Sequence, residues 1–547
     1  MKLPLLTRLT LYGLVLSVGA ALMIGLHTGP RVLWLKIPYL FNVTGLASGS
    51  FLLLAAVGLI LSKSYAAEWT TALERLGQLP PTTLSRAVWA LGGGALIAIG
   101  TLKLCQYNSF QAHTDLADFT NVCWQALHGH GLKDEIKGFD SYLGDHFSPV
   151  LFLFAPLLSI WKSPLILQFA QSFFLALSVP GVYRLARSYG SPGLLALALP
   201  VMLVVNPYFH KTASAYFEPS TLAVPALVWA FVAWRSGRKN LGALLALSTL
   251  TFKEEAPFAL LGLGIYLLVK GKRRRKHGFL LVLTAAASFF IITQLIIPHY
   301  LPLPVKSRHL HLFSSVGSTY SGIVLNALRH PAGFLINLLW PPAKWIAPLW
   351  LLFSAGLLPL GAPYTLIPAA VMLLPHQMSG YGSFGYQALS VHYAAFPLAL
   401  ILWSACAGLG RLTERLRGHL IPVMAFVLLV TASGLLTPSP YVEMVPLSQK
   451  RVDAAMDIIR LVPPEASVWA PTYFVAHLAC RDRLKTLTDR DYLYRGWFVP
   501  DRIILDGRAW SALPEGTKKD ILQVLRTTHY RRAAEEEGVI LLEKVNS

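Results

Sequence analysis

Long apolar segments recur along most of this chain and restrict it to a fold that keeps them out of water. They lie at residues 5–26, 46–61, 87–104, 165–186, 194–205, 222–234, 241–252, 256–269, 279–297, 345–360, 364–374, 394–409 and 419–436. Several are shorter than the roughly 20 residues of a straight span, which indicates tilted or broken helices around a cavity. Hydrophobic residues make up 54% of the chain and charged residues 14%, too little polar surface for a soluble protein. The sequence therefore predicts an α-helical polytopic membrane protein with about 13 transmembrane helices.

The formal net charge of +20 is better explained by membrane topology than by nucleic-acid binding. Lysine and arginine concentrate in short cytoplasmic loops, and the densest cluster is 272–276. Other basic residues mark the same side: Lys63, Arg75, Arg86, Arg184, Arg187, Arg235, Arg238, Lys239, Arg411, Arg415 and Arg417. Alternation from these anchors puts the amino terminus in the cytoplasm and the carboxyl terminus outside. For the crossings to fit, the apolar stretch 147–161, which contains Pro156, is expected to lie on the membrane or to re-enter it.

The chain is expected to have three parts. Residues 1–86 hold the N-terminal transmembrane helices and a cytoplasmic loop, and residues 87–437 form a transmembrane core with an external loop at 105–163. After Pro438 the charge density is that of an ordinary soluble protein, and strand and helix patterns alternate. Residues 438–547 are therefore expected to form a small extracytoplasmic α/β domain.

Acidic residues and histidines gather in the loops that this topology puts outside the cytoplasm. Asp115 and Asp118 stand near the start of the long external loop, and His146 follows in the same loop. A carboxylate beside a bilayer is costly unless it faces water, a partner or a substrate, so these residues are functional candidates. A helix N-cap or an external salt bridge would also explain Asp115.

Histidine and cysteine leave a metal site and a disulfide open. Some of the 16 histidines could bind a divalent metal together with Asp115, although no His-Glu-x-x-His spacing is present. The metal ligands and cofactors are therefore unknown, with a divalent metal as the candidate. Cys105 and Cys123 share the external loop and could pair in an oxidising compartment, whereas Cys406 lies in an apolar segment and Cys480 in the tail.

The order of these features resembles the GT-C superfamily, which comprises integral-membrane glycosyltransferases that use polyprenyl-phosphate sugars. More closely, the chain resembles a prokaryotic family of predicted membrane proteins that carry a domain of unknown function. The matching pieces are Asp115-Leu116 with Trp124-Gln125, His146-Phe147-Ser148-Pro149, Phe209-His210, Lys253-Glu254-Glu255-Ala256-Pro257 and His392-Tyr393. The resemblance covers roughly residues 87–409 and extends loosely into the tail.

The resemblance implies roles for these residues. Asp115 and Asp118 are expected to be the catalytic carboxylates, with Asp115 as the base that takes a proton from the attacking hydroxyl. A departing polyprenyl phosphate leaves negative charge at the headgroup level, which Lys253 and a histidine could stabilise. Lys253 could instead only neutralise one of the two acids that follow it. The residues expected to bind substrate are His146, His210, Lys253, Glu254, Glu255 and His392; Asp145 and Glu218 are weaker candidates for acceptor or metal contacts.

The sequence thus favours an inverting, GT-C-like glycosyltransferase of the cell membrane, working on the cell envelope. It would transfer a sugar from a polyprenyl-phosphate donor to an unknown acceptor at the outer face. Its expected partners are membrane lipid and that donor, and nucleic acid is not expected. A transporter or lipid flippase would also have short, proline-broken spans, although no internal repeat is evident. A non-catalytic scaffold or receptor is a third alternative.

Overall fold

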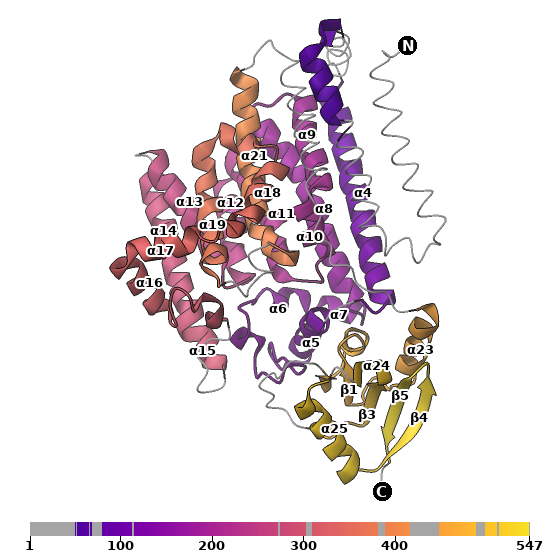
Figure 1. Ribbon diagram of the computed structural model, residues 1–547. Coiled ribbons are helices and arrows are strands. Elements are labelled where there is room, and N and C mark those ends of the chain that lie inside the picture. Colours follow the sequence, from indigo (N-terminus) through magenta and orange to yellow (C-terminus); the bar gives the residue numbers. More distant parts are fainter. Residues whose placement is uncertain are drawn as a thin grey trace.

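The computed structural model is a bundle of helices with a small sheet domain at one end (Figure 1). The described residues are 50, 52–64, 66–67, 79–111, 114–271, 274–301, 309–380, 389–415, 448–487, 498–510 and 513–545. The predicted spans 5–26 and 419–436 lie outside these ranges. So do Arg75, Arg417 and the first two residues of the basic cluster 272–276.

Helices form almost all of the described chain before residue 416. They are Leu52–Leu61, α4 (Pro81–Asn108), α5 (Thr114–Leu127), α6 (Leu151–Phe154), α7 (Leu157–Ile160), α8 (Leu165–Ser188), α9 (Gly193–Val205), α10 (Pro207–Ser214), α11 (Ala223–Arg235), α12 (Lys239–Ser248), α13 (Ala256–Lys270), α14 (Arg275–Phe290), α15 (Ile297–Tyr300), α16 (Tyr320–Arg329), α17 (Pro331–Leu339), α18 (Ile346–Ser354), α19 (Ile367–Met378) and α21 (Ala395–Arg415). The short helical turns near the site are η1 (Tyr142–Gly144), η2 (Pro219–Leu222), η3 (Thr249–Thr251), η6 (Leu310–Phe313) and η10 (Val391–Ala394).

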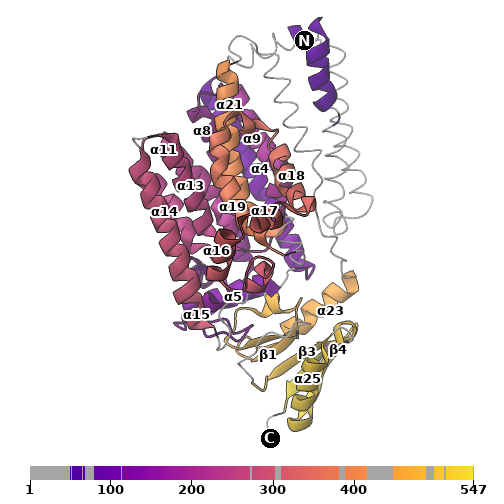
Figure 2. The ribbon, with the colours of Figure 1, turned by 60° about the vertical axis from the view of Figure 1, so that its left-hand side comes forward.

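Four of the described helices are long and apolar enough to cross a membrane. They are Pro81–Asn108, Leu165–Ser188, Arg275–Tyr300 and Val391–Arg415, and the bent pair α9–α10 would make a fifth. In two views these helices run side by side, with α21 and α8 inside the bundle (Figures 1 and 2). The chain is therefore a multi-pass membrane protein, and the predicted total of about 13 spans is not established by the described part.

Local sequence explains the break between α9 and α10. The two helices meet at an angle of 49° at Asn206. Pro207 cannot donate the backbone hydrogen bond that would continue α9, and the Asn206 side chain instead accepts hydrogen bonds from the N–H groups of Tyr208 and Phe209. The expectation of broken helices is met here.

The stretch 147–161 forms two helices, α6 and α7, of four residues each. A four-residue helix is only about 6 Å long, so this stretch does not cross the membrane as a helix. Leu153 and Ile160 are 77% and 76% exposed, and α6 and α7 lie beside α5 at the end of the bundle (Figure 1). Apolar side chains exposed at this end are consistent with a segment that lies on the membrane.

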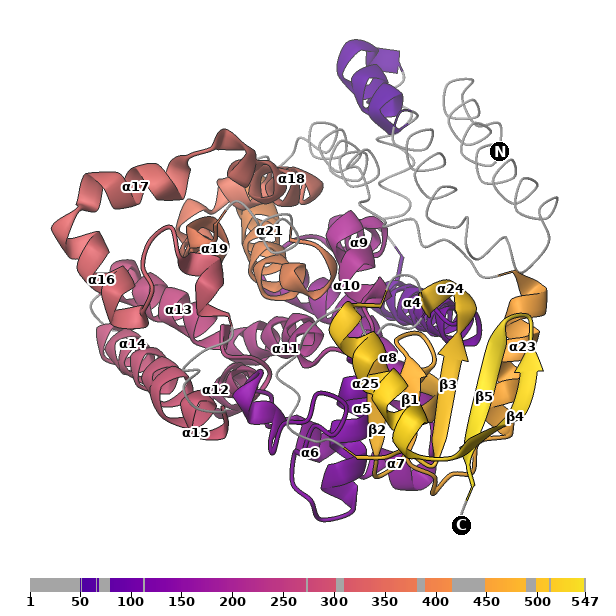
Figure 3. The ribbon, with the colours of Figure 1, turned by 60° about the horizontal axis from the view of Figure 1, so that its bottom comes forward.

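The C-terminal part contains a five-stranded sheet in the order β2-β1-β3-β5-β4 (Figure 3). Its elements are α23 (Gln449–Arg460), β1 (Val468–Pro471), η11 (Val475–Leu478), β2 (Leu484–Leu487), β3 (Arg502–Asp506), α24 (Gly507–Trp510), α25 (Glu515–Thr527), β4 (Tyr530–Glu536) and β5 (Val539–Lys544). β1 pairs in parallel with β2 and β3, and β5 pairs antiparallel with β3 and β4. The small α/β unit predicted after residue 438 is therefore present, while the exact domain boundaries stay predictions.

This sheet domain packs on α5. The buried amide of Asn121 donates hydrogen bonds to the carbonyls of Ala479 and Arg481, at 3.0 and 2.8 Å. The amide of Gln125 donates to the carbonyl of Asp482, and the indole N–H of Trp124 donates to the Asp482 carboxylate. One face of α5 is thus fixed by the C-terminal domain, which limits the positions that its first turn can take.

The four cysteines are all free. The disulfide between Cys105 and Cys123 that the sequence left open is therefore not formed. Cys123 is fully buried inside α5, where its thiol points toward the carbonyl of Leu151 at 3.6 Å. Burial among apolar side chains accounts for it without a covalent partner.

Candidate functional site

The two predicted catalytic carboxylates lie one turn apart on α5 in different environments. Asp115 is in the first turn and is exposed, whereas Asp118 is 1% exposed. The Lys137 ammonium lies 2.7 Å from Asp118 and 3.0 Å from Asp145. Burial raises the pKa of Asp118 above its usual range, and Lys137 opposes that shift. Asp118 thus ties α5 to the following loop, while Asp115 remains accessible.

The loop after α5 places His146 against the turn that precedes α13. The Nδ1 atom of His146 lies 2.7 Å from one carboxylate oxygen of Glu254, and the N–H of Phe147 donates to the other at 3.1 Å. The hydroxyl of Ser148 donates to the carbonyl of Phe252. Two sequence segments that are more than 100 residues apart, 146–149 and 253–257, therefore form one unit.

The ion pair between His146 and Glu254 shifts both groups toward their charged forms. Burial by itself lowers the pKa of His146, but Glu254 and Asp145 outweigh it and raise that pKa. Burial raises the pKa of Glu254, but His146 and Lys253 outweigh it and lower that pKa below its usual range.

Lys253 is the centre of a second polar group. Its Nζ atom lies 3.5 Å from Glu218 and 3.0 Å from the Nε2 atom of His392, and it faces the ring of Tyr393 at 5.2 Å. Lys253 is only 4% exposed, and burial would lower its pKa, but Glu218 and the other nearby anionic groups raise it. The ammonium therefore stays charged although its side chain is almost fully buried.

The negative charge of Asp115 influences the polar cluster around Lys253. Burial by itself raises the pKa of Glu218, but the positive charges of His392, Lys253 and His146 outweigh burial and lower that pKa. The negative charge of Asp115 acts in the opposite direction and raises it. Asp115 is thus close enough to the buried cluster to influence it, although its own side chain is exposed.

Two other expected substrate-binding residues are Glu255, which lies close to Lys253 in the chain, and His210, which is part of α10. Glu255 is 8% exposed and is one of the charges that raise the pKa of Lys253. The Nε2 atom of His210 lies 2.5 Å from the carbonyl of Val204, which is a local contact across the α9–α10 bend. This contact is local to the bend, and a role of His210 in substrate binding stays a prediction.

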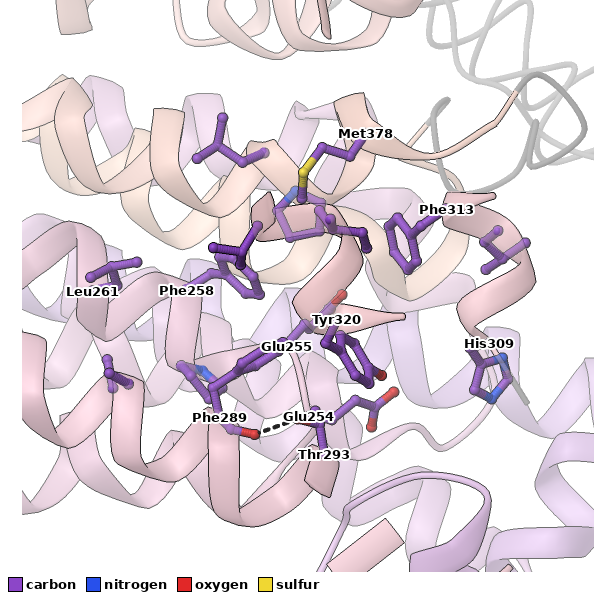
Figure 4. Close-up of a pocket in the computed structure, with 18 of the residues that line it drawn as sticks. Glu254, Glu255, Phe258, Leu261, Phe289, Thr293, His309, Phe313, Tyr320 and Met378 are labelled. Carbon is purple, nitrogen blue, oxygen red and sulfur yellow. Dashed lines mark hydrogen bonds between the residues drawn. The ribbon is translucent and has the colours of Figure 1, made fainter. Parts of the chain in front are cut away.

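A cavity of about 580 Å³ opens beside these polar groups. Apolar side chains from α13, α14, α16, α17 and α19 form most of its wall, and His146, Lys253, Glu254, Glu255, His309 and Tyr393 line it as well. Figure 4 shows Glu254, Glu255 and His309 grouped near Tyr320, with Leu261, Phe258 and Met378 farther along the wall. The cavity is therefore amphipathic.

The apolar wall continues to the outside of the bundle. Val324 and Leu328 of α16 line the cavity and are 60% and 76% exposed. Part of the apolar wall is thus formed by side chains that are also exposed on the outside of the bundle.

Several residues that complete the site had little or no weight in the sequence-based predictions. Lys137 belongs to no recognised motif, and its position in an acid-rich loop is the one sequence signal that could have identified it. Glu218 precedes a proline in a predicted outer loop and was ranked low, although it is the partner of Lys253. His309 was one of many outer histidines; it stacks on His146 with ring centroids 4.4 Å apart. Among the described residues, Asp145, His146 and His309 form a group that could hold a metal ion.

The fold and the amphipathic cavity define a helical, multi-pass membrane protein with a charged site at one end of the bundle. Residues 106–541 match the family model DUF2079, described as predicted membrane protein. Because this match covers most of the chain, the protein belongs to that family, as the sequence resemblance predicted.

No curated protein matches the chain. Among solved structures, one match is the crystal structure of ArnT from Cupriavidus metallidurans bound to undecaprenyl phosphate. The two chains are 12% identical with a TM-score of 0.44, and the match covers 83% of this chain and 98% of ArnT. Similarity at this level leaves the chemistry of the site to be argued from the residues of this chain.

Proposed function

We propose that this protein is an inverting, GT-C-like glycosyltransferase that moves a sugar from a polyprenyl-phosphate donor to an acceptor at the outer face of the membrane. The observation that carries the proposal is the cavity of about 580 Å³, which has apolar walls and a buried cation, Lys253, at its polar end. A polyprenyl-phosphate sugar has the same division into a hydrocarbon chain and an anionic head.

The apolar part of the cavity would bind the start of the prenyl chain. Phe258, Phe289, Phe313 and Phe334 contribute flat hydrophobic surface to its wall. Removing hydrocarbon from water contributes about 25 cal/mol per Å² of buried surface, but a prenyl chain already lies in lipid. Shape and aromatic contact would therefore select the ligand more than the hydrophobic effect would.

Lys253 would bind the phosphate and stabilise the negative charge that develops as the sugar leaves. Glu218 and His392 hold its ammonium in place, so little reorganisation is needed when the phosphate arrives. The ion pair with Glu218 weakens the net positive charge but keeps Lys253 protonated. The apolar wall has a low dielectric constant, which strengthens the attraction between the Lys253 ammonium and the phosphate.

Asp115 would be the general base. It is exposed, so an acceptor hydroxyl arriving from water can reach it, and it lies near enough to Glu218 to affect its pKa. A carboxylate that removes the acceptor proton permits a single displacement at the anomeric carbon, which inverts its configuration. Asp118, which is buried against Lys137, would hold the first turn of α5 and would not touch substrate.

Sidedness is part of the proposal. The basic residues of the loops favour a cytoplasmic amino terminus, an outer site and an extracytoplasmic sheet domain. In Figure 1 the α5 segment and the sheet domain lie at the same end of the bundle, which supports a shared side for both.

The test is sugar transfer by the purified protein in lipid, with a panel of polyprenyl-phosphate sugars as donors. Release of polyprenyl phosphate together with a new glycosidic bond of inverted configuration is the expected result. Movement of the lipid and of the sugar across the bilayer is followed in parallel. Translocation of an intact donor, with no glycosidic bond made or broken, would overturn the proposal and favour the transporter or flippase; binding without either event would favour the scaffold.

A further inference from the structure

Three side chains next to the cavity are arranged as the ligands of a metal ion. One ligand atom each from Asp145, His146 and His309 lies within 4.8 Å of the others. Asp145 and His146 are consecutive in the loop after α5, and His309 comes from the segment before α16. The three residues therefore meet only in the tertiary structure.

The partner of His146 gives a second, independent indication. Its Nδ1 atom is held 2.7 Å from Glu254, so Nε2 is the nitrogen at which a metal ion could replace the proton of the charged ring. Histidines that bind metals almost always make this contact, because a carboxylate on the second nitrogen fixes the tautomer and the orientation of the ring.

His309 supplies a third indication. Its Nε2 atom is buried and lies 3.4 Å from Asp145 Oδ1, so the imidazole and the carboxylate already face each other. The ring is nearly parallel to that of His146, at 10° and 4.4 Å between centroids. A cation bound by both groups would replace this long contact with two direct bonds to the metal.

We infer that Asp145, His146 and His309 bind a divalent transition-metal ion, with zinc as the best match to two imidazoles and a carboxylate. Ligands about 2.0–2.2 Å from a tetrahedral zinc lie roughly 3.4 Å apart. The present 4.8 Å limit requires a movement of about 1.4 Å, which rotation of the His309 side chain, 38% exposed, can provide. Three protein ligands leave the fourth position open toward the cavity, as in catalytic zinc sites.

The open position suits a phosphate oxygen, and this part of the inference rests on the proposed function. His146, His309 and Lys253 line the same cavity. A metal ion there would place a second positive charge at its polar end and would share the phosphate with Lys253.

Metal binding is tested without any measurement of transfer. Purified full-length protein in nanodiscs is stripped with a chelator, loaded with Zn²⁺ alone, desalted and analysed by mass spectrometry for zinc. We expect one ion per chain, with two imidazoles in its X-ray absorption spectrum. That spectrum needs no variant, so it stays informative if a substitution prevents folding. Protein that retains no zinc, or zinc without imidazole ligands, would overturn the inference.

Variants assign the ligands. His309→Gln, His146→Gln and Asp145→Asn should each weaken Zn²⁺ binding, measured against a competing chelator. Glu254→Gln removes only the support of His146 and should weaken binding by roughly 10–100-fold. His330→Gln, an exposed histidine at the start of α17, is the matched control and should have no effect. Equal affinity in His309→Gln and in this control would overturn the assignment.

The phosphate contact is tested on protein loaded with Co²⁺, whose visible spectrum reports its ligands. Farnesyl phosphate should change that spectrum, and an unchanged spectrum would overturn the open-position assignment. The proposed function fails separately, through the absence of sugar transfer by protein that binds zinc normally.

Discussion

The Nζ atom of Lys253 lies 3.0 Å from the Nε2 atom of His392, although 139 positions separate the two residues in the chain. An ammonium can only donate, so this His392 nitrogen must accept, and the proton of the neutral ring is on Nδ1. Nδ1 faces Glu218 at 3.9 Å. The three side chains thus form a closed group that holds the cation at the edge of the cavity.

Asp115→Asn is expected to reduce turnover by on the order of 10²-fold or more, because the amide keeps the size of the side chain but cannot take a proton. Donor binding should change much less, since it is assigned to Lys253 and the histidines. The measurement is the initial rate of sugar transfer at saturating donor. Asp140→Asn, an exposed acid in the following loop, is the control, and equal rates in the two variants would remove Asp115 from the mechanism.

Lys253→Ala is expected to weaken donor binding, because it removes the charge that meets the phosphate and leaves Glu218 buried without its lysine. The dissociation constant of a polyprenyl-phosphate sugar is measured in nanodiscs. Lys133→Ala is the control, since that lysine is 43% exposed and pairs with Glu135 in the loop. A donor affinity unchanged in Lys253→Ala would contradict its placement at the phosphate.

Glu218→Gln should make donor binding sensitive to alkaline pH. In the wild type Glu218 is the leading charge that raises the pKa of Lys253 against the lowering effect of burial. Without that carboxylate the balance shifts toward the lowering effect of burial, so the pKa of Lys253 falls relative to the wild type and the charged form is lost at a lower pH. Binding by the wild type should stay level between about pH 7 and 10, whereas binding by the variant should decline. Parallel profiles would show that Glu218 does not set the protonation of Lys253.

Membrane sidedness is expected to follow the basic loops. Single cysteines replacing Asp140 or Glu515 should react with an impermeant reagent applied from outside, whereas one replacing Arg274 should not. All three positions are in the described part of the chain, and the Glu515 side chain is 80% exposed. Labelling at position 274 from outside would reverse the topology and place the site on the cytoplasmic face.

Gly408→Ala should destabilise the bundle. A Cβ atom at Gly408 would lie 1.8 Å from the carbonyl oxygen of Leu358, so α21 could not keep its contact with the 358–361 turn. The expected cost is at least about 1–3 kcal/mol of unfolding free energy, measured by thermal unfolding in detergent. Gly93→Ala is the control, because nothing lies within 4 Å of its added Cβ atom and alanine favours a helix. Equal melting temperatures in the two variants would contradict the close approach.

The site could be predicted in part because its motifs are local. His146-Phe147-Ser148-Pro149 and Lys253-Glu254-Glu255 were recognised as separate pieces, and the bond between His146 and Glu254 joins them. The burial of Asp118 against Lys137 could not be predicted, since the distance of Asp118 from Asp115 along the chain gives no information about burial. His210 was named through the resemblance, and its role stays a prediction beside its local contact with Val204.

The sequence alone determined that this chain is a multi-pass membrane protein with a small α/β unit at its end. Those properties depend on the composition of contiguous segments, which hydropathy and charge report directly. Only the tertiary structure decided which polar groups meet: Lys253 with Glu218 and His392, Lys137 with Asp118, and His309 with Asp145 and His146. These contacts join segments up to 164 positions apart, as the numbers of Asp145 and His309 show (309 minus 145). They arise from how the helices pack, and no local pattern in the chain encodes that packing.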